Sequence, residues 1–203
     1  QNDVLGYTLR AVSHFNGDFT ELPRKTLGWS LFVSPIIGIG NSENFMDLLN
    51  SIRGISLIVS LASIYPMYLL ARRFFDEKYS LVATFLFAVE PHLNHNAGLG
   101  LSEPLFILVT ILSVYFVLSK NPKSFYIAFL LVGMLWWIKF NGIVMLPVIS
   151  LLFFLNLRKT PSLIPKFLLG LGIFFVIISP MLLQRYDLYG DPLYFSQSST
   201  LYM

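Results

Sequence analysis

The sequence has no cysteine and little charge. With no cysteine among its 203 residues, the chain is neither a disulfide-stapled small domain nor a protein with a paired-cysteine metal site. Only 12% of the residues are charged, about half of the roughly 25% that is typical of soluble domains, whereas 55% are hydrophobic. Polar surface is too scarce to cover a compact core, and the hydrophobicity excludes a disordered chain. The composition therefore predicts a polytopic membrane protein.

Apolar segments of different lengths recur along the chain, and residues 79–89 are short for a span but are counted as one. A spanning helix needs about 20 apolar residues, so residues 29–39 are too short and are expected to lie along the membrane surface or dip into it. Residues 1–51 are expected to form an outer loop with interfacial segments, in which residues 4–15 have amphipathic helical spacing. The predicted fold is an all-α transmembrane bundle with about six spans: 52–71, 79–89, 105–118, 125–138, 143–157 and 163–183.

Basic residues are distributed unequally between the two sets of loops. One set contains Arg72, Arg73, Lys78, Lys120, Lys123, Arg158, Lys159 and Lys166, and the other contains Arg10, Arg24, Lys25, Arg53, Lys139 and Arg185. Short cytoplasmic loops carry an excess of Lys and Arg, so the first set is predicted to be cytoplasmic. Of the 11 acidic residues, only Asp76 and Glu77 fall on that side. The candidate catalytic and binding residues are therefore predicted to lie on the outer face. The net charge of +3 is small, and no nucleic-acid partner is expected.

Acidic residues near the membrane edge are costly and are usually retained where a site uses them. Asp3 could accept a proton from a hydroxyl group, or it could be a solvated residue or a helix N-cap. Glu90, His92, His95 and Glu103 flank a glycine-containing turn, and they could bind a divalent metal or a phosphate. The alternative is a polar outer loop in which Glu103 interacts with the dipole of a helix N-terminus.

Several cations are predicted on the outer side, against the usual topological bias. They include Lys25, Arg53, Lys139 and Arg185. Arginine presents a planar fork that matches phosphate oxygens and lysine presents a point charge, so such a group would suit an anionic, lipid-linked substrate. The alternative is that each stem lies in lipid while its charge reaches water.

Short motifs occur in series along the chain. They lie at residues 3–19, where Asp3 and Tyr7 precede a Gly-Asp pair, at residues 101–106 around Glu103-Pro104, at residues 137–142 around Lys139, and at residues 185–192, which end in Gly-Asp-Pro. This series resembles the polytopic GT-C glycosyltransferases related to dolichyl-phosphate-mannose protein mannosyltransferases and aminoarabinose transferases. The Lys-Pro-Pro-Leu run of that family is altered here, with Thr26 and Leu27 in place of the prolines.

The resemblance implies a membrane enzyme that transfers a sugar from a polyprenyl-phosphate donor to a protein, lipid or glycan acceptor, with inversion, on the non-cytoplasmic face. Asp3 would be the catalytic aspartate, and Glu103 would position the sugar or hold a metal. The donor phosphate would be bound by Lys25, Arg53, Lys139 and Arg185. Metal dependence stays open.

The resemblance also bears on the extent of the chain and on its location. The family's first spanning helix would precede Gln1, so residues 1–203 are expected to be the N-terminal part of a GT-C transmembrane domain. The chain would be a multi-pass protein surrounded by membrane lipids, in the cell membrane if the source is prokaryotic. The alternative function is a transporter or flippase of a lipid-linked or anionic solute, although transporters often contain internal repeats and none is found here.

Overall fold

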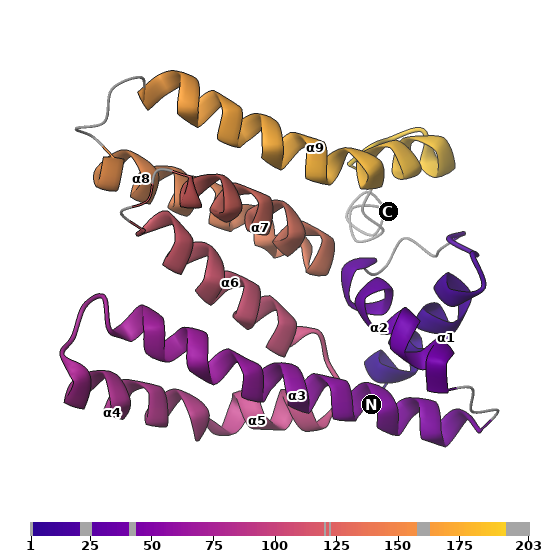
Figure 1. The fold of residues 1–203 in the computed structure, drawn as a ribbon. Helices are drawn as coiled ribbons and strands as arrows, with labels where there is room; N and C mark the ends of the chain where they lie inside the picture. The colour runs from indigo at the N-terminus through magenta and orange to yellow at the C-terminus, as the bar shows by residue number, and fades with distance from the viewer. Residues whose placement is uncertain are drawn as a thin grey trace, which may run out of the picture.

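The computed structural model describes residues 2–20, 26–40, 44–119, 121, 123–157 and 163–193. The described residues form nine α-helices and one 3-10 helix, η1, without a strand (Figure 1). The all-α prediction is confirmed. In chain order the elements are α1 (Asn2–Phe15), α2 (Gly28–Gly40), α3 (Phe45–Ala71), α4 (Glu77–Ala88), α5 (Pro91–Gly98), α6 (Glu103–Val117), α7 (Ser124–Ile138), η1 (Phe140–Val144), α8 (Met145–Leu157) and α9 (Leu163–Tyr189).

The long helices lie side by side in one bundle. Helix α6 packs between α3 and α7, and α7 packs in turn against α9 and α8 (Figure 1). The pair formed by α1 and α2 lies across one end of this bundle, where it contacts α3 and α7. The α1–α2 pair and the bundle are thus joined at one end of the bundle.

Each predicted span corresponds to helical structure. Only α3 and α9 among the described helices, with 27 residues each, are long and apolar enough by themselves to cross a membrane. The shorter apolar helices, α6, α7 and the η1–α8 segment, lie between them in the bundle. The number of spans therefore stays a prediction.

A helix break separates α4 from α5. Pro91 opens α5, and the Glu90 side chain accepts a hydrogen bond from the Leu93 backbone amide, which makes Glu90 the N-cap. This hydrogen bond lowers the pKa of Glu90. The polar segment that follows is helical, with His92 and His95 exposed, and it continues along α3 beyond α4 (Figure 1). Helix α4 has only 12 residues, and α5 extends the packing of this segment along α3.

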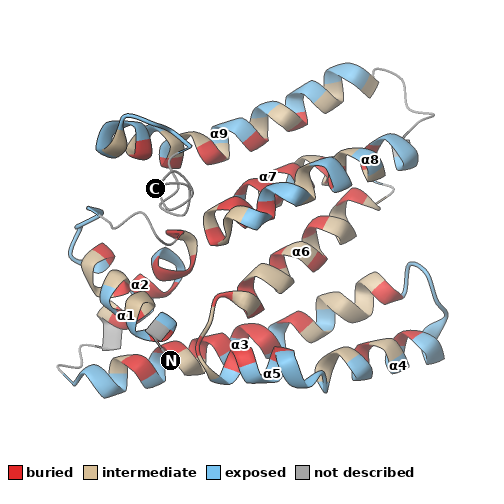
Figure 2. Cartoon of the chain, turned by 180° about the vertical axis from the view of Figure 1, so that it is seen from behind, coloured by how far each residue is buried: buried red, intermediate tan, exposed pale blue. Residues whose placement is uncertain are grey.

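Apolar side chains cover the outward faces of the bundle. Figure 2 shows exposed residues along α4 and α9, and the exposed set includes Ile58 and Leu61 on α3 and Val176 on α9, each about two-thirds exposed. A water-soluble bundle would place polar residues on such faces. Inside the bundle, Phe129 and Phe174 are buried. These apolar outward faces are those expected of helices surrounded by lipid.

Small residues allow the helices to approach closely. A Cβ atom at Gly133 of α7 would lie 2.7 Å from Cγ2 of Ile177 on α9, and the Trp137 indole N–H donates a hydrogen bond of 2.8 Å to the Ile177 carbonyl. A Cβ atom at Gly28 would lie 2.6 Å from the Trp137 backbone. These contacts fix the C-terminal end of α7 against both α9 and α2. This end of α7 leads directly into the candidate site.

Candidate functional site

The candidate residues come from elements that meet at the end of the bundle covered by α1 and α2. Asp3 lies in the first turn of α1 and Glu103 in the first turn of α6, whereas Lys139 directly follows α7. Arg53 lies in the N-terminal half of α3, and Arg185 in the C-terminal part of α9 (Figure 1). Lys25 lies outside the described residues.

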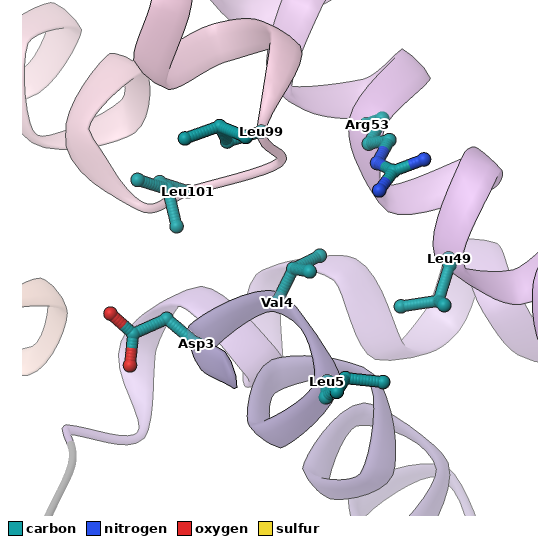
Figure 3. Close-up of a pocket in the computed structure, with 7 residues that line it drawn as sticks. All are labelled: Asp3, Val4, Leu5, Leu49, Arg53, Leu99 and Leu101. Atoms are coloured by element: carbon teal, nitrogen blue, oxygen red, sulfur yellow. The ribbon is translucent and has the colours of Figure 1, made fainter. Parts of the chain in front are cut away.

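Asp3 and Arg53 line the same pocket, which has a volume of about 460 Å³ and is otherwise lined by leucine and valine. Figure 3 shows them on opposite sides of this pocket, with the Asp3 carboxylate directed away from the Arg53 guanidinium. The Arg53 Nη1 donates a hydrogen bond to Asn50, and its Nε is buried without a hydrogen-bond partner in the described structure. The Asp3 carboxylate is exposed and can be reached by a substrate.

Glu103 and Lys139 form an ion pair. The Lys139 Nζ lies 2.6 Å from Oε1 of Glu103, and both side chains are about one-third exposed. Glu103 and Lys139 are 36 positions apart and were given different roles in the sequence analysis, and the structure brings them into contact. Solvent screening weakens the electrostatic attraction of a partly buried pair less than that of a fully exposed pair. Each partner also holds the other in a defined position.

The turn at residues 100–103, between α5 and α6, is held by several other elements. Each of its four residues interacts with a different part of the chain. The contacts are Trp29 Nε1 to the Gly100 carbonyl (3.2 Å), Ser56 Oγ to the Leu101 carbonyl (3.1 Å), the Tyr7 hydroxyl with Ser102 Oγ (3.3 Å), and Lys139 to Glu103. Helices α1, α2 and α3 and the end of α7 thus converge on this turn.

The conformation of Gly100 is required by this turn, because its φ of 75° is strained for residues other than glycine. A Cβ atom there would also lie 3.1–3.3 Å from side-chain atoms of Val4, Arg53 and Ile52. We expect Gly100→Ala to lower the free energy of unfolding by about 1–2 kcal/mol, as measured by thermal unfolding in detergent. The matched control is Gly98→Ala, which is helical and has no atom within 4 Å of the added Cβ. Equal unfolding temperatures for the two variants would contradict this role of Gly100.

Tyr7 connects the Asp3 end of α1 to the turn. It lies four residues after Asp3, and therefore on the same helix face. Burial raises the pKa of Tyr7, the hydrogen bond to Ser102 opposes this rise, and the negative charges of Glu103 and Asp3 add to it. The hydroxyl group stays protonated at neutral pH and can donate a hydrogen bond. The sequence-based candidate set contained neither Tyr7 nor Ser102, although the spacing from Asp3 and the position of Ser102 before Glu103 were available signals.

Arg185 has a different environment. It is buried, and its guanidinium carbon lies 4.3 Å from the centre of the Phe140 ring, in a cation–π arrangement. The described lining of the Asp3 pocket includes Arg53 but not Arg185, Glu103 or Lys139. The structure therefore places Asp3 and Arg53 along one pocket and pairs Glu103 with Lys139.

The sequence left open a divalent metal. Within the described residues, there is no group of three or more His, Cys, Asp or Glu side chains close enough to hold a metal ion. Glu103 instead makes its contact with Lys139.

Comparison with known families decides the class of the protein. A family model described as dolichyl-phosphate-mannose-protein mannosyltransferase matches residues 36–183, more than half of the chain. The chain belongs to this family. Dolichyl-phosphate-mannose-protein mannosyltransferases are integral membrane glycosyltransferases with a lipid-linked sugar donor, so the chain is a glycosyltransferase of this type. No curated protein and no solved structure matches it significantly.

The match to the mannosyltransferase family covers only part of the candidate site. Arg53, Glu103 and Lys139 lie inside the matched segment, whereas Asp3 and Arg185 lie outside it. The membership confirms the resemblance found in the sequence. The roles of the individual site residues stay proposals.

Proposed function

We propose that this glycosyltransferase moves a sugar from a polyprenyl-phosphate donor to a hydroxyl group of a protein, lipid or glycan acceptor on the non-cytoplasmic face of a membrane. One observation carries the proposal. Asp3 lies one helical turn from Tyr7, the Tyr7 hydroxyl is hydrogen-bonded to Ser102, and Ser102 directly precedes Glu103 of the ion pair with Lys139. A candidate base and a candidate phosphate-binding cation therefore lie on the same structural unit.

The proposed reaction is a single displacement with inversion. The acceptor oxygen forms a bond to the anomeric carbon as its proton passes to the Asp3 carboxylate. The bond between the anomeric carbon and the donor phosphate oxygen breaks, and the electron pair leaves with polyprenyl phosphate. Lys139 and Arg53 stabilise the negative charge that develops on this phosphate, and such stabilisation is strongest where water is excluded. Glu103 holds Lys139 and contacts the sugar.

A second cavity supports a lipid-linked donor. An almost entirely apolar groove of about 360 Å³ lies between α2, α6, α7 and α9. Ile138 and Leu105 line this groove. In the sequence, Ile138 directly precedes Lys139 and Leu105 follows Glu103 by two positions. The lining of the groove therefore includes residues next to, or two positions from, the two partners of the ion pair in the sequence. A polyprenyl chain in this groove would place its phosphate next to Lys139.

The test uses the full-length protein in liposomes with radiolabelled dolichyl-phosphate mannose and a membrane extract as the source of acceptor. We expect the label to pass to a product that is no longer linked to phosphate, with one polyprenyl phosphate released for each sugar transferred. Movement of intact donor across the bilayer without loss of its sugar would overturn the proposal and favour the transporter alternative.

A further inference from the structure

The turn at residues 100–103 stands out because its contacts come from parts of the chain that are far apart. The hydrogen bond between Tyr7 and Ser102 joins residues 95 positions apart, and that between Trp29 and Gly100 joins residues 71 positions apart. Ser102 is fully buried, and its position is further fixed by the bonds to the carbonyl groups of Gly100 and Leu101 on its N-terminal side. The Tyr7 hydroxyl thus meets a rigid partner.

Helix α1 is joined to the bundle by the hydrogen bond between Tyr7 and Ser102 and by apolar contacts. The Thr8 hydroxyl bonds back to the Val4 carbonyl within α1 itself, so it adds no link to another helix. Val4 and Ala11 are buried in the adjoining core, where apolar contacts are non-directional, whereas a hydrogen bond prefers a defined direction. The Tyr7 hydroxyl lies on the same face as Asp3 and can fix the rotation of the helix.

We propose that Tyr7 and Ser102 are positioning residues of the transferase, and that their hydrogen bond sets the placement of Asp3 relative to the Glu103–Lys139 ion pair. This inference rests on the proposed function, because it takes Asp3 as the base. Both residues act through Asp3 and neither is assigned a contact with the substrate. A displacement of about 1 Å at a reacting group can reduce the rate about 100-fold, so the loss of one hydroxyl group is expected to be visible in kcat.

The variant Tyr7→Phe removes a single oxygen atom and keeps the partly buried ring, so the protein is expected to fold. In the transfer assay with full-length protein, we expect kcat to fall about 10- to 100-fold while the KM for the donor stays within about twofold of the wild-type value. The matched control is Tyr79→Phe, in which the same atom is removed from an exposed tyrosine of α4. An unchanged kcat in Tyr7→Phe, an equal loss in Tyr79→Phe, or a raised KM with an unchanged kcat would each overturn the inference.

A double-mutant cycle separates positioning from a general loss of packing. Ser102→Ala is expected to lower kcat to about the same extent as Tyr7→Phe, and the double variant is expected to lose little more than either single variant, because all three lack the same bond. Losses that multiply in the double variant would overturn the inference.

Asp3→Asn, assayed beside these variants, distinguishes the two proposals. If Asp3→Asn keeps its activity, Asp3 is not the base and the proposed mechanism fails. If Asp3→Asn is inactive while Tyr7→Phe has a normal kcat, only the positioning role fails.

Discussion

Asp3→Asn is expected to lower the rate of sugar transfer by about 100- to 10,000-fold, which is the contribution that a general base usually makes. Asparagine has nearly the same shape as aspartate but cannot take the proton of the acceptor hydroxyl. Asp3 is exposed at the start of α1, so its replacement is not expected to disturb the buried core. The measurement is the initial rate of transfer by full-length protein in liposomes, with membrane insertion checked by protease protection.

The chain offers a matched control for this experiment in Asp18. This aspartate follows α1 and is exposed, and its carboxylate accepts hydrogen bonds from the backbone and hydroxyl groups of Thr20. These bonds lower the pKa of Asp18, which makes its carboxylate a poorer base. We expect Asp18→Asn to transfer sugar at close to the wild-type rate. A wild-type rate in Asp3→Asn, or an equal loss in Asp18→Asn, would remove Asp3 from the mechanism.

The second large effect is expected at Lys139. Loss of a charge-assisted contact to phosphate costs about 1.5–3 kcal/mol, so Lys139→Met should reduce kcat/KM about 10- to 100-fold, through both a higher KM for the donor and a lower kcat, because Lys139 contacts the donor phosphate and also stabilises the charge that develops on it. The change also leaves the Glu103 carboxylate without its counter-charge and brings a negative group close to the incoming phosphate. The measurement is the dependence of the transfer rate on donor concentration.

Two further variants make this result specific. Lys123 lies at the other end of the same helix, α7, and is exposed, so Lys123→Met removes an equal charge and should leave the KM unchanged. Glu103→Gln frees Lys139 from its partner, so it should lower kcat without raising the KM for the donor. A higher KM in Lys123→Met, or an unchanged KM in Lys139→Met, would show that Lys139 does not bind the donor phosphate.

The sequence predicted the helices well because their signal is local. A long apolar run between polar turns can satisfy its backbone only as a helix in lipid, and residues 163–183 accordingly lie within α9. The start of α3 was placed too late, since Asn44 caps the helix through the Met46 amide before the apolar run begins. The segment at residues 91–98 was expected to be part of a polar loop because proline and glycine interrupt it, but it forms helix α5, which Glu90 caps and Pro91 opens.

The candidate site was predictable as a set of residues but not as an arrangement. Asp3, Glu103 and Lys139 could be selected because ionisable groups are rare near the membrane and the motifs occur in order. The ion pair between Glu103 and Lys139 depends on how α6 packs against α7, and no local pattern encodes that packing. The bond between Tyr7 and Ser102 likewise depends on the docking of α1 at the end of the bundle.

The contacts of the turn at residues 100–103 also impose an order on biosynthesis. Helices α1 and α2 leave the ribosome before α3 to α9, and their bonding partners are made much later: Ser102 for Tyr7, Gly100 for Trp29, and the Ile138 carbonyl for Thr26, 112 residues further along. The complete set of hydrogen bonds of α1 and α2 with these partners can therefore form only after α7 has been synthesised and inserted. The site is completed when α1 and α2 dock on the bundle after α7 has formed. A chain truncated before α7 would contain Asp3 but lack the structure that positions it.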